Sequence, residues 1–293
     1  MPSGILLLDK PRGLTSNAAL QRVRALLSRP KAGHVGSLDP LATGMLPLCL
    51  GEATKIAGEI LAARKRYRFT LSLGARTATG DAEGAVTASA PVPPLERGAV
   101  EAVLAQFRGR QKQTPPMYSA LKRAGQPLYR LARSGVTVER AAREVELFEL
   151  ELLRLETAGL ELEILCSKGT YVRALAEDLA QALGTCGHVS ALRRLYVEPF
   201  AAEPMQTLES LAEVRARGAW PALLPPDWPL AHLAAVRLEA DEARRLLQGQ
   251  SVPAQVPEAP ARVRLYDDSG VFLGLGEADG RAVRPRRLLN PGV

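Results

Sequence analysis

The chain has 293 residues, of which 38 are Lys or Arg and 31 are Asp or Glu, giving a formal charge of +7 at pH 7. With 46% hydrophobic residues it can bury a full core, which excludes a disordered chain and fits one large domain plus a small one. The sequence shows no apolar run of the ~18 residues that a membrane span needs, and no secretory signal pattern, so we expect a cytoplasmic protein.

The N-terminal part of the sequence predicts a strand, a helix, a shaped loop and a second strand. An apolar run at 4–8 is typical of a strand, and apolar residues at helical spacing predict a helix over 17–28. The segment 33–44 contains glycines and a proline, and it is too broken for a helix and too varied for a linker. From Tyr67 to Leu73 apolar and polar residues alternate, which predicts a half-buried strand.

The rest of the chain predicts a mixed set of elements with a break near its end. An irregular, basic arm over 108–133 stands between helices and paired strands, and the proline-rich segment 220–229 is the best candidate linker. Beyond this linker we expect a small, mostly β domain. The expected helices are 98–107, 171–183, 207–217 and 239–248, and the expected strands are 144–156, 160–166, 192–200, 262–266, 271–276 and 282–288.

The basic residues are unevenly spread along the sequence. Three stretches, 10–38, 60–80 and 102–138, contain no carboxylate and hold almost half of all Lys and Arg, while the remainder of the chain is acidic. Such a split is typical of a polyanion-binding face.

Several kinds of chemistry lack their usual motifs. The sequence has no phosphate-binding or dinucleotide-binding glycine motif, no zinc-deaminase or metalloprotease motif and no serine-hydrolase elbow. Cys49, Cys166 and Cys186 are an odd number without a C-x-x-C, so we interpret them as core thiols and expect no metal and no cofactor.

One carboxylate remains conspicuous, Asp39, which lies near His34 in the glycine-bounded loop. From the residues alone, the favoured interpretation of Asp39 is a turn or helix-cap residue before Pro40, because Asp-Pro is a common turn dipeptide. His34 is then an ordinary loop histidine, and Tyr67 a core aromatic of its strand.

The loop Gly33–Gly44 resembles the G-H-x-G-x-L-D-P-x-A-T-G signature of the TruB family of tRNA pseudouridine synthases. A soft departure is Ser37, where alanine or threonine is common. Further segments similar to that family follow in its order along the chain: Leu8–Gly13, Leu50–Lys55, Lys65–Arg68, Pro116–Lys122, Cys166–Arg173, His188–Val189, Leu192–Leu195 and Pro285–Arg287.

The resemblance implies an α+β fold: a pseudouridine synthase catalytic domain over 1–230 with a mixed, largely antiparallel sheet, and a small β-barrel of PUA type over 231–293. It implies conversion of uridine 55 in the T loop of tRNA to pseudouridine. In this reaction the N1–C1′ bond breaks and C1′ joins C5 of the same base. The resemblance makes Asp39 the carboxylate that either attacks C1′ or removes the C2′ proton, and both routes stay open.

The same resemblance implies roles for five further side chains. Arg173 pairs with Asp39 and would keep it ionised, because an opposite charge at contact lowers a carboxylate pKa. Tyr67 stacks on the target base and helps to remove the C5 proton. Tyr171 and Leu192 line the base pocket, and His34 lies against the RNA where the flipped uridine has left its stack.

The resemblance also implies how the RNA is held. The insertion at about 102–138 and the basic residues near the N-terminus would grip the T stem, with Lys10, Lys112, Lys122 and Arg193 as RNA-binding residues. The chain lacks the long basic extensions of guide-RNA-dependent relatives, so we expect a monomer that needs no guide RNA and no protein partner. The alternative is a tRNA-binding or tRNA-folding protein without catalysis.

Overall fold

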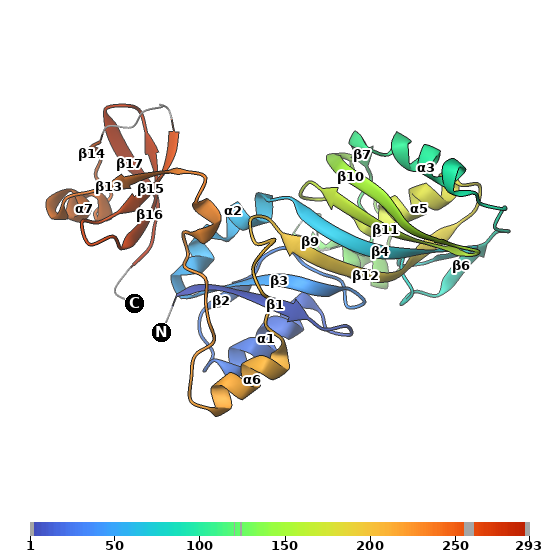
Figure 1. The fold of residues 1–293 in the computed structure, drawn as a ribbon, viewed down its shortest axis with the longest axis horizontal. Coiled ribbons are helices and arrows are strands. Elements are labelled where there is room, and N and C mark those ends of the chain that lie inside the picture. The colour runs from blue at the N-terminus through green and yellow to red at the C-terminus, as the bar shows by residue number, and fades with distance from the viewer. Residues whose placement is uncertain (1–2, 120, 124, 255–260, 291–293) are drawn as a thin grey trace.

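The computed structural model describes residues 3–119, 121–123, 125–254 and 261–290. A long, twisted sheet of eight strands runs through most of the molecule, and a smaller five-stranded sheet lies at one end (Figure 1). The large sheet has the order β1-β3-β12-β4-β11-β10-β7, with β2 beside β3. Its strands are β1 (Gly4–Lys10), β2 (Ala32–His34), β3 (Thr43–Leu50), β4 (Lys65–Leu73), β7 (Gly109–Gln113), β10 (Arg143–Glu156), β11 (Gly159–Cys166) and β12 (Gly187–Val197).

The pairing in this sheet is antiparallel except where β12 runs parallel to β3. The sheet is therefore mixed and largely antiparallel, as expected. The parallel contact is short, with Arg193 opposite Thr43 and Arg194 opposite Gly44.

The eight-stranded sheet is buried on both faces near the N-terminus. In β1, Leu6 and Leu8 belong to one apolar cluster while Ile5 and Leu7 belong to another. Strand β3 is divided in the same way, which explains why its continuous apolar sequence gave no alternation and no strand was predicted there.

The helices cover the sheet and agree with the sequence pattern. Each of the five predicted helices begins and ends within two residues of its expected bounds. Thr15 caps α1 by accepting a hydrogen bond from the backbone N of Ala18, and α6 packs against α1 on one side of β1 and β3 (Figure 1). The helices are α1 (Ser16–Leu26), α2 (Ala57–Ala62), α3 (Arg97–Gln106), α4 (Leu128–Arg133), α5 (Val172–Ala182), α6 (Leu208–Ala216) and α7 (Ala240–Leu247), with the 3₁₀ helices η1 (Gly51–Ile56) and η2 (Trp228–Leu230).

The basic arm differs from its expected form. Its first residues are strand β7, which pairs with β10 and so belongs to the main sheet, while α3 packs on β10. The segment that leaves the sheet begins after Gln113 and returns at Arg143, and it contains the short pair β8 (Lys122–Arg123) and β9 (Gln126–Pro127) followed by α4. Sequence pattern missed β7 because its residues Gly-Arg-Gln-Lys-Gln are nearly all polar, as suits an edge strand.

Two further differences are the start of one strand and an additional hairpin. Strand β12 begins at Gly187, five residues before the expected start, and a bulge near Ser190 interrupts its alternation. The hairpin β5 (Ala75–Thr77) and β6 (Val86–Ser89) was not predicted; it brings the loop 78–85 back toward β12 through a bridge between Asp81 and Val189.

The C-terminal sheet curls around its own apolar core. Its order is β13-β15-β16-β17-β14, with α7 packed against β14 and β17. It rests on η1 and α2 of the larger domain, where Leu275 and Leu289 join the cluster of Ile56 and Ile60. The strands are β13 (Ala234–Arg237), β14 (Val252–Pro253), β15 (Ala261–Tyr266), β16 (Phe272–Ala278) and β17 (Ala282–Leu288).

Cys49 and Cys166 are buried free thiols and Cys186 is half-buried. Among the described residues, no helix is long and apolar enough to cross a membrane, and no group of three or more His, Cys, Asp or Glu side chains could hold a metal ion.

Candidate active site

The loop between β2 and β3 carries Asp39. Its apolar residues Leu38, Leu41 and Ala42 are buried in the main core, so the loop is fixed on both sides of the carboxylate. Ser16, the first residue of α1, accepts from the Leu38 backbone N at 2.7 Å and donates to the Leu38 carbonyl at 3.0 Å. Packing and hydrogen bonds thus hold the backbone of the loop while the Asp39 side chain stays 39% exposed.

Gly44 closes the loop, and no other residue fits there. Its φ is +96°, and a Cβ atom at this position would lie 2.1 Å from the backbone oxygen of Arg194. The close approach lets β3 pair with β12 directly behind the loop.

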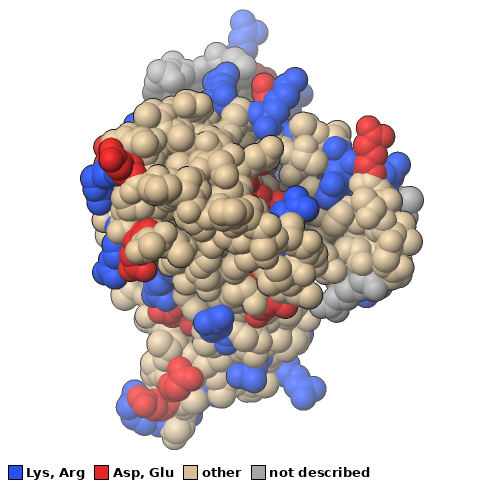
Figure 2. Space-filling model, turned by 90° about the vertical axis from the view of Figure 1, so that its right-hand side faces the viewer, with Lys and Arg blue, Asp and Glu red and all other residues tan. Residues whose placement is uncertain are grey.

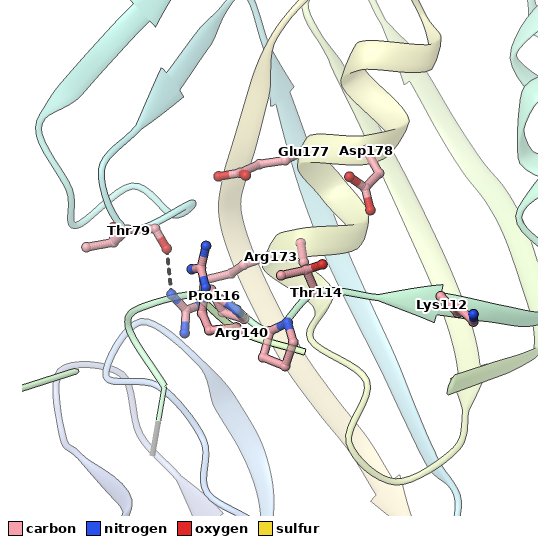
Figure 3. A pocket seen from close by; sticks show the side chains of 10 residues that line it. Thr79, Lys112, Thr114, Pro116, Arg140, Arg173, Glu177 and Asp178 are labelled. Atoms are coloured by element: carbon pink, nitrogen blue, oxygen red, sulfur yellow. Dashed lines mark hydrogen bonds between the residues drawn. The ribbon is translucent and has the colours of Figure 1, made fainter. Parts of the chain in front are cut away.

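Arg173 meets Asp39 from the second residue of α5. Its Nε lies 2.9 Å from Asp39 Oδ2, and its Nη2 donates to Asp39 Oδ1 at 3.3 Å. The guanidinium is almost fully buried and donates to the Thr79 carbonyl at 2.5 Å (Figure 3). It also donates to the Tyr118 carbonyl at 2.7 Å. The pairing implied by the family resemblance is present, and Arg173 is held firmly enough to orient the carboxylate.

The electrostatics of Asp39 differ from the simple expectation. Arg173 lowers the pKa of Asp39, as expected, but desolvation by the surrounding protein is the larger cause and leaves that pKa above its ordinary value. The negative charge of Asp81 adds to the rise in the pKa of Asp39. Asp81 is close by, since its Oδ2 lies 3.8 Å from the same Nε of Arg173. Arg173 is therefore needed to keep ionised a carboxylate that the site itself disfavours in its charged form.

Tyr67 and Leu192 lie on the same face of the sheet, in neighbouring cross-strand pairs. Tyr67 on β4 stands opposite Arg194 on β12, and Leu192 stands opposite Phe69, so these side chains share a face. Tyr67 and Leu192 are each 8% exposed. Burial raises the pKa of Tyr67, and the positive charge of Arg194 opposes the rise.

Tyr171 stands immediately before α5. Its backbone N donates to Gln113 Oε1 at 2.8 Å, and Gln113 Nε2 donates back to the Tyr171 carbonyl at 3.1 Å. The pair joins the end of β7 to the start of the helix that carries Arg173. Burial raises the pKa of the half-buried Tyr171 hydroxyl.

His34 ends β2 at the near side of the loop. Its Nδ1 is buried and has no hydrogen-bond partner among the described residues. Burial and the charge of Arg194 lower the pKa of His34, so the ring is neutral at pH 7.

Lys10 is placed differently from the expectation of an RNA-contacting residue. It is fully buried, and its ammonium donates to the carbonyls of Pro11, Leu14 and Pro40. Burial lowers its pKa to about 8, and the main opposing cause is the charge of Asp39. Lys10 therefore supports the back of the Asp39 loop, and in this structure it is not open to a phosphate.

The other three residues expected to bind RNA are accessible. Lys112 on β7 and Lys122 on β8 are exposed. Arg193 is partly exposed and forms a two-bond ion pair with Asp9, at 3.0 and 2.8 Å.

A polar cleft of about 350 Å³ is lined by Arg173 and by other residues of α5, β7 and the segment that follows β7 (Figure 3). It has both signs of charge. Its walls are Thr79, Lys112, Thr114, Pro115, Pro116, Arg140, Arg173, Ala174, Glu177 and Asp178.

Charge on the outer surface is more mixed than the sequence suggested. On the face shown in Figure 2, Lys and Arg gather at the top and along the edges, while the middle is largely uncharged. On that face the Lys and Arg side chains therefore do not form one continuous patch.

Two residues of the site were missed from the sequence, Asp81 and Arg194. Asp81 is the first carboxylate after the second acid-free stretch, just as Asp39 is the first after the first stretch, and this parallel was the available signal. For Arg194 the pattern of β12 gave no sign that this arginine, at 1% exposure, would be fully buried.

Comparison with solved structures defines the class of fold. An H/ACA ribonucleoprotein bound to a substrate RNA containing 2′-deoxyuridine gives a TM-score of 0.74 with 22% identity, covering 98% of this chain and 85% of that one. A Cbf5–Nop10–Gar1 complex gives 0.74 with 24% identity, covering 97% and 84%. At this identity the likeness shows the fold alone, which is the mixed α/β fold of pseudouridine synthases.

The chain belongs to the TruB family of pseudouridylate synthases. The family's N-terminal domain model matches residues 24–172, and two C-terminal models match 173–224 and 234–289. A protein of Ectopseudomonas mendocina named tRNA pseudouridine synthase B is 53% identical over 99% of this chain and 96% of its own length. Proteins of the same name from Pseudomonas aeruginosa and Hydrogenovibrio crunogenus are 51% and 47% identical over 98% of this chain.

Proposed function

We propose that this protein converts uridine 55 in the T loop of tRNA to pseudouridine. The observation that carries the proposal is the Asp39–Arg173 ion pair in a chain that belongs to the TruB family. Its full-length relatives are named tRNA pseudouridine synthase B. A protein that only binds or folds tRNA, the alternative, has no need of a carboxylate held by a buried arginine.

Asp39 supplies the reacting carboxylate. In one route an Asp39 oxygen bonds to C1′ as the N1–C1′ bond breaks, and the electron pair of that bond goes to the uracil. After the base rotates, C5 attacks C1′, the carboxylate leaves, C5 loses its proton and N1 gains one. In the other route Asp39 removes the C2′ proton as the N1–C1′ bond breaks, which leaves a C1′=C2′ double bond and the electron pair on the uracil. After the base rotates, C5 bonds to C1′, C2′ regains its proton from Asp39, C5 loses its proton and N1 gains one. Both routes require ionised Asp39, and partial exposure leaves it open to a substrate.

The uridine must leave its stack to reach Asp39. Flipping a base costs on the order of a few kcal/mol, which contacts to the RNA offset. Tyr67 and Leu192 share a sheet face at the site, which suits them to hold the base, and Tyr171 stands at the start of α5. His34 is neutral, so it suits packing against RNA bases better than pairing with a phosphate. Tyr67 is the candidate to accept the C5 proton.

The arm and the C-terminal sheet are the proposed RNA grips. Lys112 is exposed at the base of the arm and Lys122 is exposed within it. The arm also reaches the site, because the Tyr118 carbonyl accepts a hydrogen bond from Arg173. The curled C-terminal sheet is proposed to be a PUA-type domain. Its strand β17 and the turn before it carry four exposed arginines that suit phosphate contact, Arg281, Arg284, Arg286 and Arg287. We further propose a cytoplasmic monomer that acts without guide RNA or protein partner.

The test is Asp39→Asn, which keeps the shape of the side chain and removes its charge. We expect release of tritium from tRNA carrying [5-³H]uridine to stop, while the Kd for tRNA stays within about threefold of the original. Asp268→Asn, at an exposed turn of the C-terminal sheet, is the matched control and should release tritium at the normal rate. Normal turnover by Asp39→Asn would rule out the mechanism, and absence of tritium release by the unaltered protein would rule out the function.

A further inference from the structure

Arg194 is a buried arginine whose charge has no carboxylate partner among the described residues. It takes part in none of the ion pairs found there, although its side chain is one of the most buried in the molecule. A buried charge is costly unless hydrogen bonds compensate it. The hydrogen bonds of Arg194 therefore indicate which parts of the structure this residue stabilises.

The side chain of Arg194 holds the two flanks of the Asp39 loop. Its Nη2 donates to the carbonyl of Gly36 at 2.9 Å, before Asp39, and its Nε donates to the carbonyl of Met45 at 2.6 Å, after it. Its backbone also lies close to Gly44, where a Cβ would be 2.1 Å from the Arg194 oxygen. Arg194 thus contacts the Asp39 loop on both sides of the carboxylate.

The same residue lies next to Tyr67. The two residues stand opposite each other on β12 and β4, so their side chains share a face of the sheet. The positive charge of Arg194 opposes the rise that burial causes in the pKa of Tyr67. Arg194 has no acceptor capacity, so toward the phenolic oxygen it can only donate.

We propose that Arg194 is a positioning residue for the isomerisation, joining the Asp39 loop to the Tyr67 hydroxyl so that the carboxylate and the phenol face one uridine at a fixed separation. The proposal rests on the proposed function and goes beyond it by assigning a role to a residue that touches neither substrate nor Asp39. A positive charge beside the phenolic oxygen also favours the phenolate, which is the form of Tyr67 that can accept the C5 proton.

The test uses Arg194→Gln and Arg194→Lys in the full-length protein. We expect the single-turnover rate of pseudouridine formation at saturating protein to fall about 100-fold in Arg194→Gln, because the charge and the second donor are removed. Arg194→Lys keeps the charge and should recover at least about tenfold of that loss. The Kd for tRNA should stay within about threefold in both, since Arg194 is not accessible to RNA.

Arg264 supplies the matched control. It lies in the C-terminal sheet, far from Asp39 in the fold, and its guanidinium donates to the Leu233 carbonyl at 3.0 Å and to the Tyr266 hydroxyl at 3.2 Å. Arg264→Gln therefore removes the same kinds of hydrogen bond away from the chemistry. Its saturating rate should stay within about threefold of the original.

A double-mutant cycle with Tyr67→Phe separates positioning from general loss of structure. If Arg194 acts jointly with Tyr67, the double variant should lose at least about tenfold less than the product of the two single losses. Independent, multiplicative losses would overturn the proposal, and so would an Arg194→Gln rate within threefold of the original. If Arg194→Gln does not fold, the same cycle is run with Arg194→Lys. Inactive unaltered protein would count against the proposed function instead.

Discussion

One nitrogen of Arg173 stands between two carboxylates: its Nε lies 2.9 Å from Asp39 Oδ2 and 3.8 Å from Asp81 Oδ2. Asp39 is partly open to solvent, whereas the Asp81 side chain is 5% exposed and is held by the Thr79 hydroxyl and the backbone N of Glu83. The reacting carboxylate of Asp39 thus belongs to a network of three charged groups, of which the other two, Arg173 and Asp81, are buried. Changes to either buried member should alter the ionisation of Asp39, in opposite directions.

Arg173→Gln should raise the pKa of Asp39 further, because the guanidinium is the strongest group that lowers it. Activity that requires ionised Asp39 should then disappear at a higher pH as the solution is acidified. We expect a fall of about 100-fold in single-turnover rate at neutral pH, by analogy with removal of one charged donor, and an acid limb displaced upward. A rate–pH profile from pH 5 to 9 measures both effects. Arg173→Lys, which keeps the charge, should shift the limb less, and an unmoved limb in Arg173→Gln would contradict this account.

Asp81→Asn should shift the same acid limb downward. The charge of Asp81 raises the pKa of Asp39, so its removal makes Asp39 easier to ionise. The asparagine oxygen can still accept the hydrogen bonds from Thr79 and Glu83, which keeps the loop in place. The profile should be compared with that of Glu203→Gln, in a turn after β12, which should not move the limb. An upward shift in Asp81→Asn would show that its effect on Asp39 is not electrostatic.

Lys65 should make the stability of the protein depend on pH in the alkaline range. The side chain is buried and donates to the carbonyls of Leu61 and Ala63, and burial lowers its pKa from 10.5 to about 8. Between these two values the unfolded chain binds more protons than the folded one, so the lysine contribution to the free energy of unfolding rises with pH.

The measurement for Lys65 is a comparison with Lys65→Met by urea unfolding at pH 8 and about pH 10.5, the two ends of its titration range. The difference in the free energy of unfolding, original minus variant, should increase by about 1–3 kcal/mol over that range. Other groups that titrate there cancel because they are common to both proteins. A difference that stays constant or decreases would show that Lys65 keeps an ordinary pKa in the folded state.

Charge reversal at Lys112 and Lys122 should weaken tRNA binding in a salt-dependent manner. For each phosphate that the protein no longer neutralises, the slope of log K against log salt concentration should fall by about 1. Titrations at several salt concentrations measure the slope. The control is Arg97→Glu on α3, an exposed arginine paired with Glu101, which should leave the slope unchanged. An unchanged slope in Lys112→Glu and Lys122→Glu would place both residues away from the RNA.

Local pattern was sufficient for most of the fold. Five helices were predicted within two residues of their ends, because their apolar spacing and terminal residues are local properties. Strands β4, β10 and β11 followed from alternation, since each has one face toward the core. Strand β3 was missed because it is buried on both faces, and β7 was missed because it is a polar edge strand whose place depends on pairing with β10.

For the site, only the resemblance to a family predicted which residues would lie together. The order of residues in the chain gives no reason for Asp39 and Arg173 to touch, since 134 positions separate them. Lys10 shows the limit of reasoning from charge: it was expected on the RNA surface, yet its backbone position in β1 places the ammonium among three carbonyls behind the loop.

The sequence by itself determined five helices and the alternating strands, the basic surplus of its acid-free stretches and the loop that holds Asp39. Tertiary structure decided the ionisation of that loop's carboxylate, the burial of Lys10 and Arg194, and the place of Asp81 beside Arg173. The physical reason is that helix and strand formation depend on neighbours in the chain, whereas desolvation and charge pairing depend on neighbours in space, which β3, β12 and α5 bring together only in the folded protein.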